Sequence, residues 1–160
     1  MTASPDLEEA LRLLEPWRSA LRVVGPATEE QIEEAEEALG VAFPATYPSF
    51  LAELGAGSIL GSEIYGVVRD LAAPGPPNVV WMNLHLRRDA GLPEHLIVVA
   101  DLDDSSAFAL DVSGAGSYEA PVLRIWPGEP SEALVDGEVA ASFGSFFLRF
   151  AQERISIWTE

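Results

Sequence analysis

Residues 28–65 read TEEQIEEAEEALGVAFPATYPSFLAELGAGSILGSEIY, and the local signals in this stretch agree with one another. Thr28 and Gln31 have the spacing of a capping box, in which each side chain satisfies a backbone N–H at the start of a helix. Gly40 favours the end of that helix, because glycine readily adopts the left-handed conformation found at helix ends. The stretch therefore opens with a predicted helix over residues 28–39.

The second half of the stretch predicts another helix and a turn. Tyr47, Phe50 and Leu51 keep helical spacing after a hydrophobic corner around Pro44. A glycine turn then leads into a strand region over residues 59–68. The apolar positions of the two helices form the predicted core, which consists of Ile32, Leu39, Phe43, Tyr47, Phe50 and Leu51.

The outer face of the first of these helices carries a high density of negative charge without a compensating cation. Its carboxylates belong to Glu33, Glu34, Glu36 and Glu37. Pairs of like charges three or four residues apart on a helix repel by about 0.2–0.5 kcal/mol each. A solvated helix surface is the simplest interpretation. The alternative is a binding role, since the basic surface of a partner would relieve the repulsion.

The remaining chain predicts helices at both ends and strands between them. An amphipathic helix starts after Ser4, which is placed to cap it, and Pro16 divides or kinks that helix. The later segments are predicted as a proline-rich loop (70–78), a helix (79–90), strands (96–102, 107–112 and 122–126), an irregular connection (127–138) and a final helix (139–155) with an aromatic face.

Helices followed by mostly adjacent strands and a closing helix indicate an α+β fold. We expect an antiparallel sheet of about four to six strands, with the N-terminal helices and the C-terminal helix packed on it. Alternating β-α-β units, which would imply a doubly wound parallel sheet, are missing. The length of 160 residues predicts a single domain over residues 1–160.

The charge balance is strongly acidic. Asp and Glu number 26 against nine Lys and Arg, which gives a formal net charge of −17, and all nine basic residues are arginines. Nucleic acids and anionic membranes are excluded as partners, because both require clustered basic residues. The charge favours a basic protein as partner. Acidity that only keeps the protein soluble explains the composition equally well.

Cysteine is absent, which excludes disulfides, thiol catalysis and cysteine-ligated zinc. The first residues lack the basic region and apolar core of a secretory signal. No apolar run reaches the ~20 residues that are needed to span a bilayer. We therefore expect a cytoplasmic protein that is a monomer or a weak homodimer.

In the segment IVVADLD (residues 97–103), a predicted apolar strand ends in an Asp-x-Asp motif formed by Asp101 and Asp103. These two aspartates have the spacing found in haloacid-dehalogenase-type phosphotransferases. Those enzymes also need a lysine and a parallel α/β layout, and the chain offers neither. With Asp104 the two aspartates suggest a weak divalent-cation site, so a metal-dependent hydrolase remains the weakest alternative. A polar hairpin turn explains them better. His85 and His95 have no motif-spaced partner, and we predict no catalytic residue, no metal site and no cofactor.

The motifs of residues 28–65 resemble the SUKH superfamily, the domains grouped with the yeast cell-wall regulator Smi/Knr. The pattern is a T-E-E-Q-I-x-x-A-E-x-x-L-G helix, an apolar-Pro-x-x-Y-x-x-F-L helix and a glycine-rich turn, carried here by Thr28, Glu29, Ile32, Glu36, Leu39, Gly40, Phe43, Pro44, Tyr47, Phe50, Leu51, Gly55 and Gly57. Looser similarity to the family's hairpin, strand and closing helix extends the resemblance over residues 28–152. The family turn usually carries Asn-Gly-Gly, where this chain has Gly55-Ala56-Gly57.

The resemblance implies a function. Bacterial members are mostly immunity proteins that bind and neutralise toxin domains, many of them nucleases, whereas fungal members are regulatory or scaffold proteins. A nuclease site is basic because it holds phosphate, so we expect a non-enzymatic immunity protein for a cognate basic toxin. A regulatory or scaffold module that binds a cellular protein or a small ligand is the alternative. The predicted contact residues are acidic: Glu63, Asp101, Asp103, Asp104, Glu33, Glu37 and Glu53.

Overall fold

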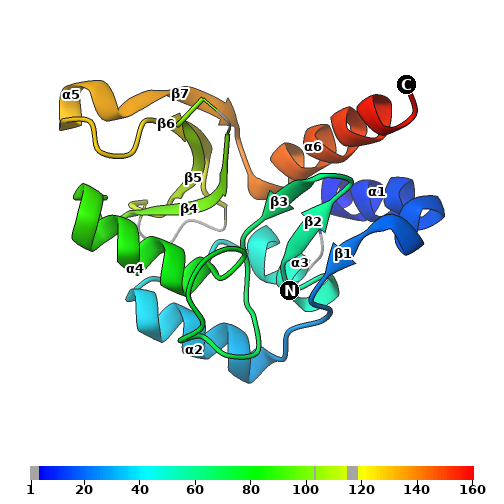
Figure 1. Cartoon of the computed structure of the whole chain (residues 1–160), viewed down its shortest axis with the longest axis horizontal. Coiled ribbons are helices and arrows are strands. Elements are labelled where there is room, and N and C mark those ends of the chain that lie inside the picture. Colours follow the sequence, from blue (N-terminus) through cyan, green and yellow to red (C-terminus); the bar gives the residue numbers. More distant parts are fainter. Residues whose placement is uncertain (1–3, 103, 115–118) are drawn as a thin grey trace.

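The structure is a computed structural model that describes residues 4–102, 104–114 and 119–160 (Figure 1). Its helices are α1 (Pro5–Leu14), the 3-10 helix η1 (Glu15–Ala20), α2 (Glu29–Leu39), α3 (Thr46–Glu53), α4 (Val79–Ala90), α5 (Ser131–Leu134) and α6 (Phe143–Trp158). Its strands are β1 (Arg22–Val23), β2 (Gly57–Ile59), β3 (Ser62–Ile64), β4 (Leu96–Asp101), β5 (Ala107–Asp111), β6 (Val122–Ile125) and β7 (Val135–Ala140). The predicted α+β class is confirmed.

The strands belong to two sheets, and all pairings between the named strands are antiparallel. One sheet has the order β1-β2-β3, and the other has the order β4-β5-β6-β7. The predicted strand region over residues 59–68 overlaps the short hairpin of β2 and β3, which starts earlier, at Gly57, and turns at Leu60 and Gly61. β1 was not predicted, because a strand of two residues has no periodicity to detect.

The two sheets meet at β4, which is an edge strand of the four-stranded sheet. The register of β4 shifts between Val98 and Ala100, and there the Val99 carbonyl accepts a hydrogen bond of 2.7 Å from the N–H of Tyr65. Beside it, the Asn83 side chain of α4 bonds both the N–H and the carbonyl of Val98. The edge of β4 that is not paired with β5 is thus hydrogen-bonded both to the segment that follows β3 and to α4.

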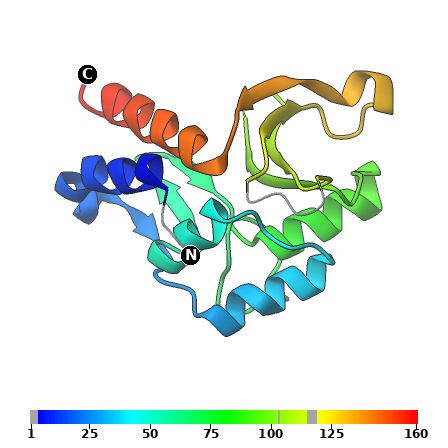
Figure 2. The same ribbon diagram turned by 180° about the vertical axis from the view of Figure 1, so that it is seen from behind.

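The helices cover the sheets at opposite ends of the molecule. α1 lies along α6 at one end, and α2 lies beside α4 at the other, as the two opposite views show (Figures 1 and 2). α3 contacts both α2 and α6. The predicted core is confirmed, since each of its members is buried: Ile32, Leu39, Phe43, Tyr47, Phe50 and Leu51.

The helix ends follow the predicted signals with one exception. The N–H of Gln31 donates to the Thr28 hydroxyl (3.1 Å) and the Gln31 side chain accepts from the Thr28 N–H (2.9 Å), which confirms the capping box. Gly40 ends α2 with a φ of 71°. α1 ends before Pro16, which lies in η1. The exception is Ser4, which precedes α1 without a capping bond from its side chain.

The prediction for residues 127–155 was partly wrong. The connection is not irregular throughout, because it contains α5 and the first part of β7, and the final helix starts at Phe143 rather than at residue 139. Ser142 caps that helix, accepting a bond of 3.1 Å from the N–H of Ser145. β7 escaped detection because it is a mostly exposed edge strand, so it lacks the apolar alternation that identifies a half-buried strand.

Candidate functional site

The structure separates the predicted contact residues into three places. One is the junction of the two sheets, the second is the turn of the β4–β5 hairpin, and the third is the surface of α2 and α3. Asp103 lies outside the described residues. The predicted residues therefore do not form one continuous cluster, and each place has its own electrostatics.

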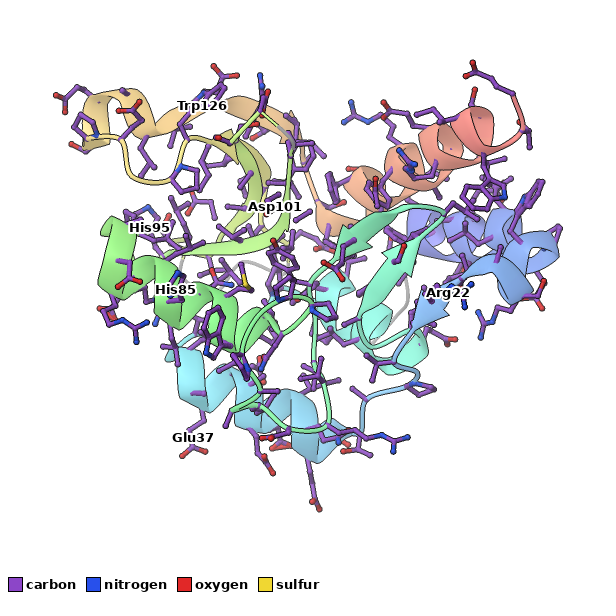
Figure 3. All side chains as sticks on the ribbon, viewed as in Figure 1. Arg22, Glu37, His85, His95, Asp101 and Trp126 are labelled. Atoms are coloured by element: carbon purple, nitrogen blue, oxygen red, sulfur yellow. The ribbon has the colours of Figure 1, made fainter. Side chains whose placement is uncertain are left out.

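Glu63 and Asp101 form a carboxylate pair at the sheet junction. Glu63 lies on β3 and Asp101 ends β4, and Figure 3 shows the Asp101 label between the two sheets. Partial burial raises the pKa of Glu63, and the negative charge of Asp101 raises it further. The pair was predicted from the sequence as two separate acidic residues, and the bond between Tyr65 and Val99 explains why they come together.

The buried ring of Tyr65 lies next to this carboxylate pair. Burial raises the pKa of the Tyr65 hydroxyl, and the nearby carboxylates of Asp101 and Glu63 raise it further. The backbone carbonyl of Tyr65 accepts a hydrogen bond of 2.8 Å from the hydroxyl of Tyr47, which ties the junction to the aromatic core. Sequence reasoning missed Tyr65 as part of this group, because an aromatic residue in a strand region indicates only core packing.

Glu63→Gln is expected to raise the melting temperature slightly at neutral pH. Folding raises the pKa of Glu63, so its ionised form destabilises the fold above that pKa, and the penalty disappears as the pH falls below the ordinary Glu value. Water screens much of the repulsion at this partly exposed site, so we expect a gain of about 1–2 °C at about pH 7.5 and none near about pH 4. Thermal unfolding followed by circular dichroism measures it.

Glu138→Gln is the matched control, because it removes one negative charge from an exposed position of β7. Its effect on the melting temperature reports only the smaller net negative charge of the protein. An equal gain in the two variants, or a gain for Glu63→Gln that persists near about pH 4, contradicts the prediction.

Asp104 is already engaged within the protein. It accepts hydrogen bonds from the hydroxyl (2.5 Å) and the N–H (3.0 Å) of Ser106, and its Oδ2 lies 2.5 Å from Nη2 of Arg124. The bonds from Ser106, with the positive charge of Arg124, lower the pKa of Asp104. Arg124 also pairs with Asp136 at 3.2 Å and lies over the ring of Trp126, which Figure 3 labels. Asp104 therefore stabilises the hairpin and presents a partly neutralised charge.

A groove of about 690 Å³ lies between α1, α2 and α3, and it contains both Glu33 and Glu53. Three further carboxylates line it: Glu8, Glu29 and Glu36. The rest of its lining is apolar except for Ser49, and consists of Leu7, Leu11, Ala27, Ile32, Pro48 and Ala52. Sequence reasoning missed the contribution of α1, because only the tertiary structure brings Glu8 into the same groove as the glutamates of α2.

Glu37 lies apart from this groove. It is exposed on α2, one helical turn after Glu33, and it is not among the groove-lining residues. Figure 3 shows its side chain pointing away from the body of the molecule. A partner that contacts both Glu33 and Glu37 therefore extends beyond the end of the groove.

A second cavity, of about 730 Å³, brings together titratable residues that sequence reasoning did not connect. Burial raises the pKa of Glu119, and the contact with Thr46 opposes that shift. The Thr46 hydroxyl donates a hydrogen bond to the Glu119 carboxylate. The cavity is also lined by Glu94, His95 and Asp111. These residues come from segments that are far apart in the sequence, so no local motif could have indicated them.

The two histidines occupy different surroundings. His85 stacks on Trp81 with the ring centroids 4.7 Å apart, and its Nδ1 lies 3.1 Å from Oδ2 of Asp89. His95 is exposed at the rim of the second cavity. Within residues 4–102, 104–114 and 119–160, no group of three or more His, Asp and Glu side chains is placed to hold a metal ion. In the same residues, every helix is too short or too polar to cross a membrane.

The fold and its surfaces define an acidic α+β protein whose carboxylates gather at a sheet junction and in a groove between helices. The chain belongs to the SUKH family, because the family model described as SMI1-KNR4 cell-wall matches residues 7–152. The match confirms the resemblance seen in the sequence and begins earlier than residue 28, so that it includes most of α1. No curated protein matches the chain.

Proposed function

We propose that this protein is an immunity protein, which binds a cognate toxin domain and neutralises it without chemistry of its own. The observation that carries this proposal is membership of the SUKH family over residues 7–152. The bacterial members of that family are mostly immunity proteins, and the resemblance implies the same role for this chain. The protein acts by occupying the active or substrate-binding site of the toxin.

The charge of the protein supplies a physical mechanism. A toxin that cleaves nucleic acid holds phosphate in a basic site, and a protein of net charge −17 is attracted to such a site from a distance. Electrostatic complementarity speeds the encounter and orients the two surfaces. The absence of lysine from the chain leaves few basic side chains to oppose this attraction.

The proposed contacts are the predicted carboxylates, and the surroundings of each carboxylate determine how much it contributes to binding. Glu63 and Asp101 repel each other in the free protein, so a basic side chain placed between them relieves an existing penalty. Asp104 contributes less, because Arg124 already pairs with it. The complete proposed set is Glu63, Asp101, Asp103, Asp104, Glu33, Glu37 and Glu53.

In this proposal the chain works as a single domain over residues 1–160, in the cytoplasm, where it meets a toxin that has entered the cell or has been made there. One molecule of the protein masks one toxin domain. The complex is expected to weaken as salt is added, because screening acts on the exposed charges that steer association.

The test uses the products of the reading frames adjacent to the gene for this chain, each expressed in a bacterial host with and without the protein. We expect one product to arrest growth, the protein to restore growth, and the two to copurify. The double variant Glu63→Arg/Asp101→Arg should weaken the complex by about tenfold or more. The control Glu132→Arg/Glu138→Arg makes the same charge change on the exposed surface of α5 and β7. Adjacent products that are all harmless, or an arrest that persists beside the soluble protein, overturn the proposal.

The second candidate is a regulatory or scaffold module that binds a cellular protein. The description of the matching family model as cell-wall favours it. The same experiment separates the two functions, because a regulatory partner copurifies with the protein but does not arrest growth when it is expressed alone.

A further inference from the structure

We propose that the groove between α1, α2 and α3 is a docking site for a basic amphipathic helix of a protein partner. The inference deepens the proposed function and rests on it only in taking the partner to be a protein. Figure 2 shows α3 between α1 and α2, with α2 lowest in that view. The apolar surface of the groove and the charge around it both favour such a partner.

The apolar surface is large enough to receive several side chains. At about 690 Å³, the groove falls within the range of established ligand pockets. Leu7 and Ile32 are buried at its base, whereas Leu11 and Pro48 are half-buried and Ala52 is exposed. A partner that covers Leu11, Pro48 and Ala52 removes apolar surface from water, which favours association.

Every charged residue that lines the groove is negative. Its five carboxylates come from all three helices, and none of them forms an ion pair with any residue that the structure describes. The nearest basic residue along α1, Arg12, pairs with Glu9 and does not line the groove. Glu36 is partly engaged, because its Oε2 accepts the N–H of Phe43 at 2.7 Å. The groove therefore presents uncompensated negative charge beside apolar surface.

This combination fits a helix better than a simple cation. Glu29, Glu33 and Glu36 follow one face of α2 and span about 10 Å along its axis. Lysine or arginine side chains one helical turn apart on a partner match that spacing, while an apolar stripe between them enters the groove. A polyamine matches the charge but leaves the apolar surface exposed to water. We therefore assign the groove to an amphipathic helix.

The test compares three probes in solution with the intact protein. The first is a synthetic peptide of about 18 residues with leucines at helical spacing, flanked by Lys and Arg. The second is a peptide of the same composition in which the leucines do not form a stripe, and the third is spermine. We expect the first peptide to bind about tenfold or more tightly than the other two, as measured by isothermal titration calorimetry. Equal binding of the three probes overturns the proposal.

Variants locate the binding site. Glu33→Arg/Glu53→Arg should weaken binding of the amphipathic peptide by about tenfold or more. The control Glu132→Arg/Glu138→Arg, with the same change of net charge on α5 and β7, should weaken it by less than about threefold. Ala52→Glu adds a carboxylate but places a longer side chain over the apolar surface, so we expect weaker binding despite the greater negative charge. Tighter binding of Ala52→Glu, or equal weakening by the two double variants, contradicts docking in the groove.

The docking groove and the immunity function can be rejected independently of each other. If Glu33→Arg/Glu53→Arg and Ala52→Glu bind the amphipathic peptide as the unsubstituted protein does, the groove is not its docking site, whether or not the protein neutralises a toxin. If no adjacent gene product is toxic, the immunity function is wrong, and peptide binding that these variants weaken still supports the groove as a site for a basic helix.

Discussion

Phe50→Ala is expected to lower the free energy of unfolding by about 3–5 kcal/mol. Phe50 lies fully buried on α3, with its ring centroid 5.2 Å from that of Phe143 and 5.0 Å from that of Phe147. Both partners belong to α6, so the truncation leaves a cavity where the two helices meet. Urea unfolding followed by circular dichroism should show the loss as a lower midpoint with a similar slope.

Phe150→Ala provides the matched control, since it deletes the same atoms from a half-buried position on α6. We expect it to cost about 1–2 kcal/mol. If Phe50→Ala is too unstable to purify, Phe50→Leu keeps much of the buried volume and should cost about 1–2 kcal/mol. Equal losses for Phe50→Ala and Phe150→Ala would contradict the central position of Phe50 in the core.

The aromatic cluster shows what periodicity predicts and where it stops. Helical spacing was enough to place Phe50 on the buried face of one helix and Phe143 and Phe147 on the aromatic face of another. It contained no information on which faces meet. That choice depends on how the chain between residues 54 and 142 returns α6 to α3, and such long-range contacts leave no local pattern in the sequence.

The carboxylates show the same limit. Glu63 and Asp101 were predicted as uncompensated charges near the glycine turn and the central hairpin, and the structure places them close to each other. Asp104 was predicted on the same ground, yet its cation is Arg124, which lies 20 residues further along the chain. Local charge therefore identifies acidic residues well. Only strand pairing shows which of them are neutralised.

Asn83→Leu is expected to lower the free energy of unfolding by about 2–5 kcal/mol, although leucine has a similar volume. The Asn83 side chain is fully buried. Its Nδ2 donates to the carbonyls of Val79 (2.8 Å) and Val98 (2.9 Å), and its Oδ1 accepts the N–H of Val98 (2.7 Å). Leucine leaves the N–H and carbonyl of Val98 buried without these bonds, and each such group costs about 1–3 kcal/mol. Urea unfolding measures the loss.

Leu84→Ala is the control on the same helix, where the side chain is exposed and truncation should cost less than about 1 kcal/mol. Hydrogen exchange at the Val98 amide separates a lost bond from a general loss of stability. That amide should exchange faster in Asn83→Leu than neighbouring core amides do, because its acceptor is gone. A Val98 amide that stays protected in Asn83→Leu would contradict this role.

Sequence reasoning missed Asn83, because a single Asn within a helix reads as an ordinary polar position, whereas here its amide pairs with β4 as a neighbouring strand would. Val98 and Val99 lie on the edge of β4 that faces α4 and the β2–β3 hairpin, and Asp101 ends the same strand. Asn83→Leu should therefore also disturb the geometry of the carboxylate pair of Asp101 and Glu63. We therefore expect this one buried amide to affect both the stability of the fold and the charge pattern proposed for binding.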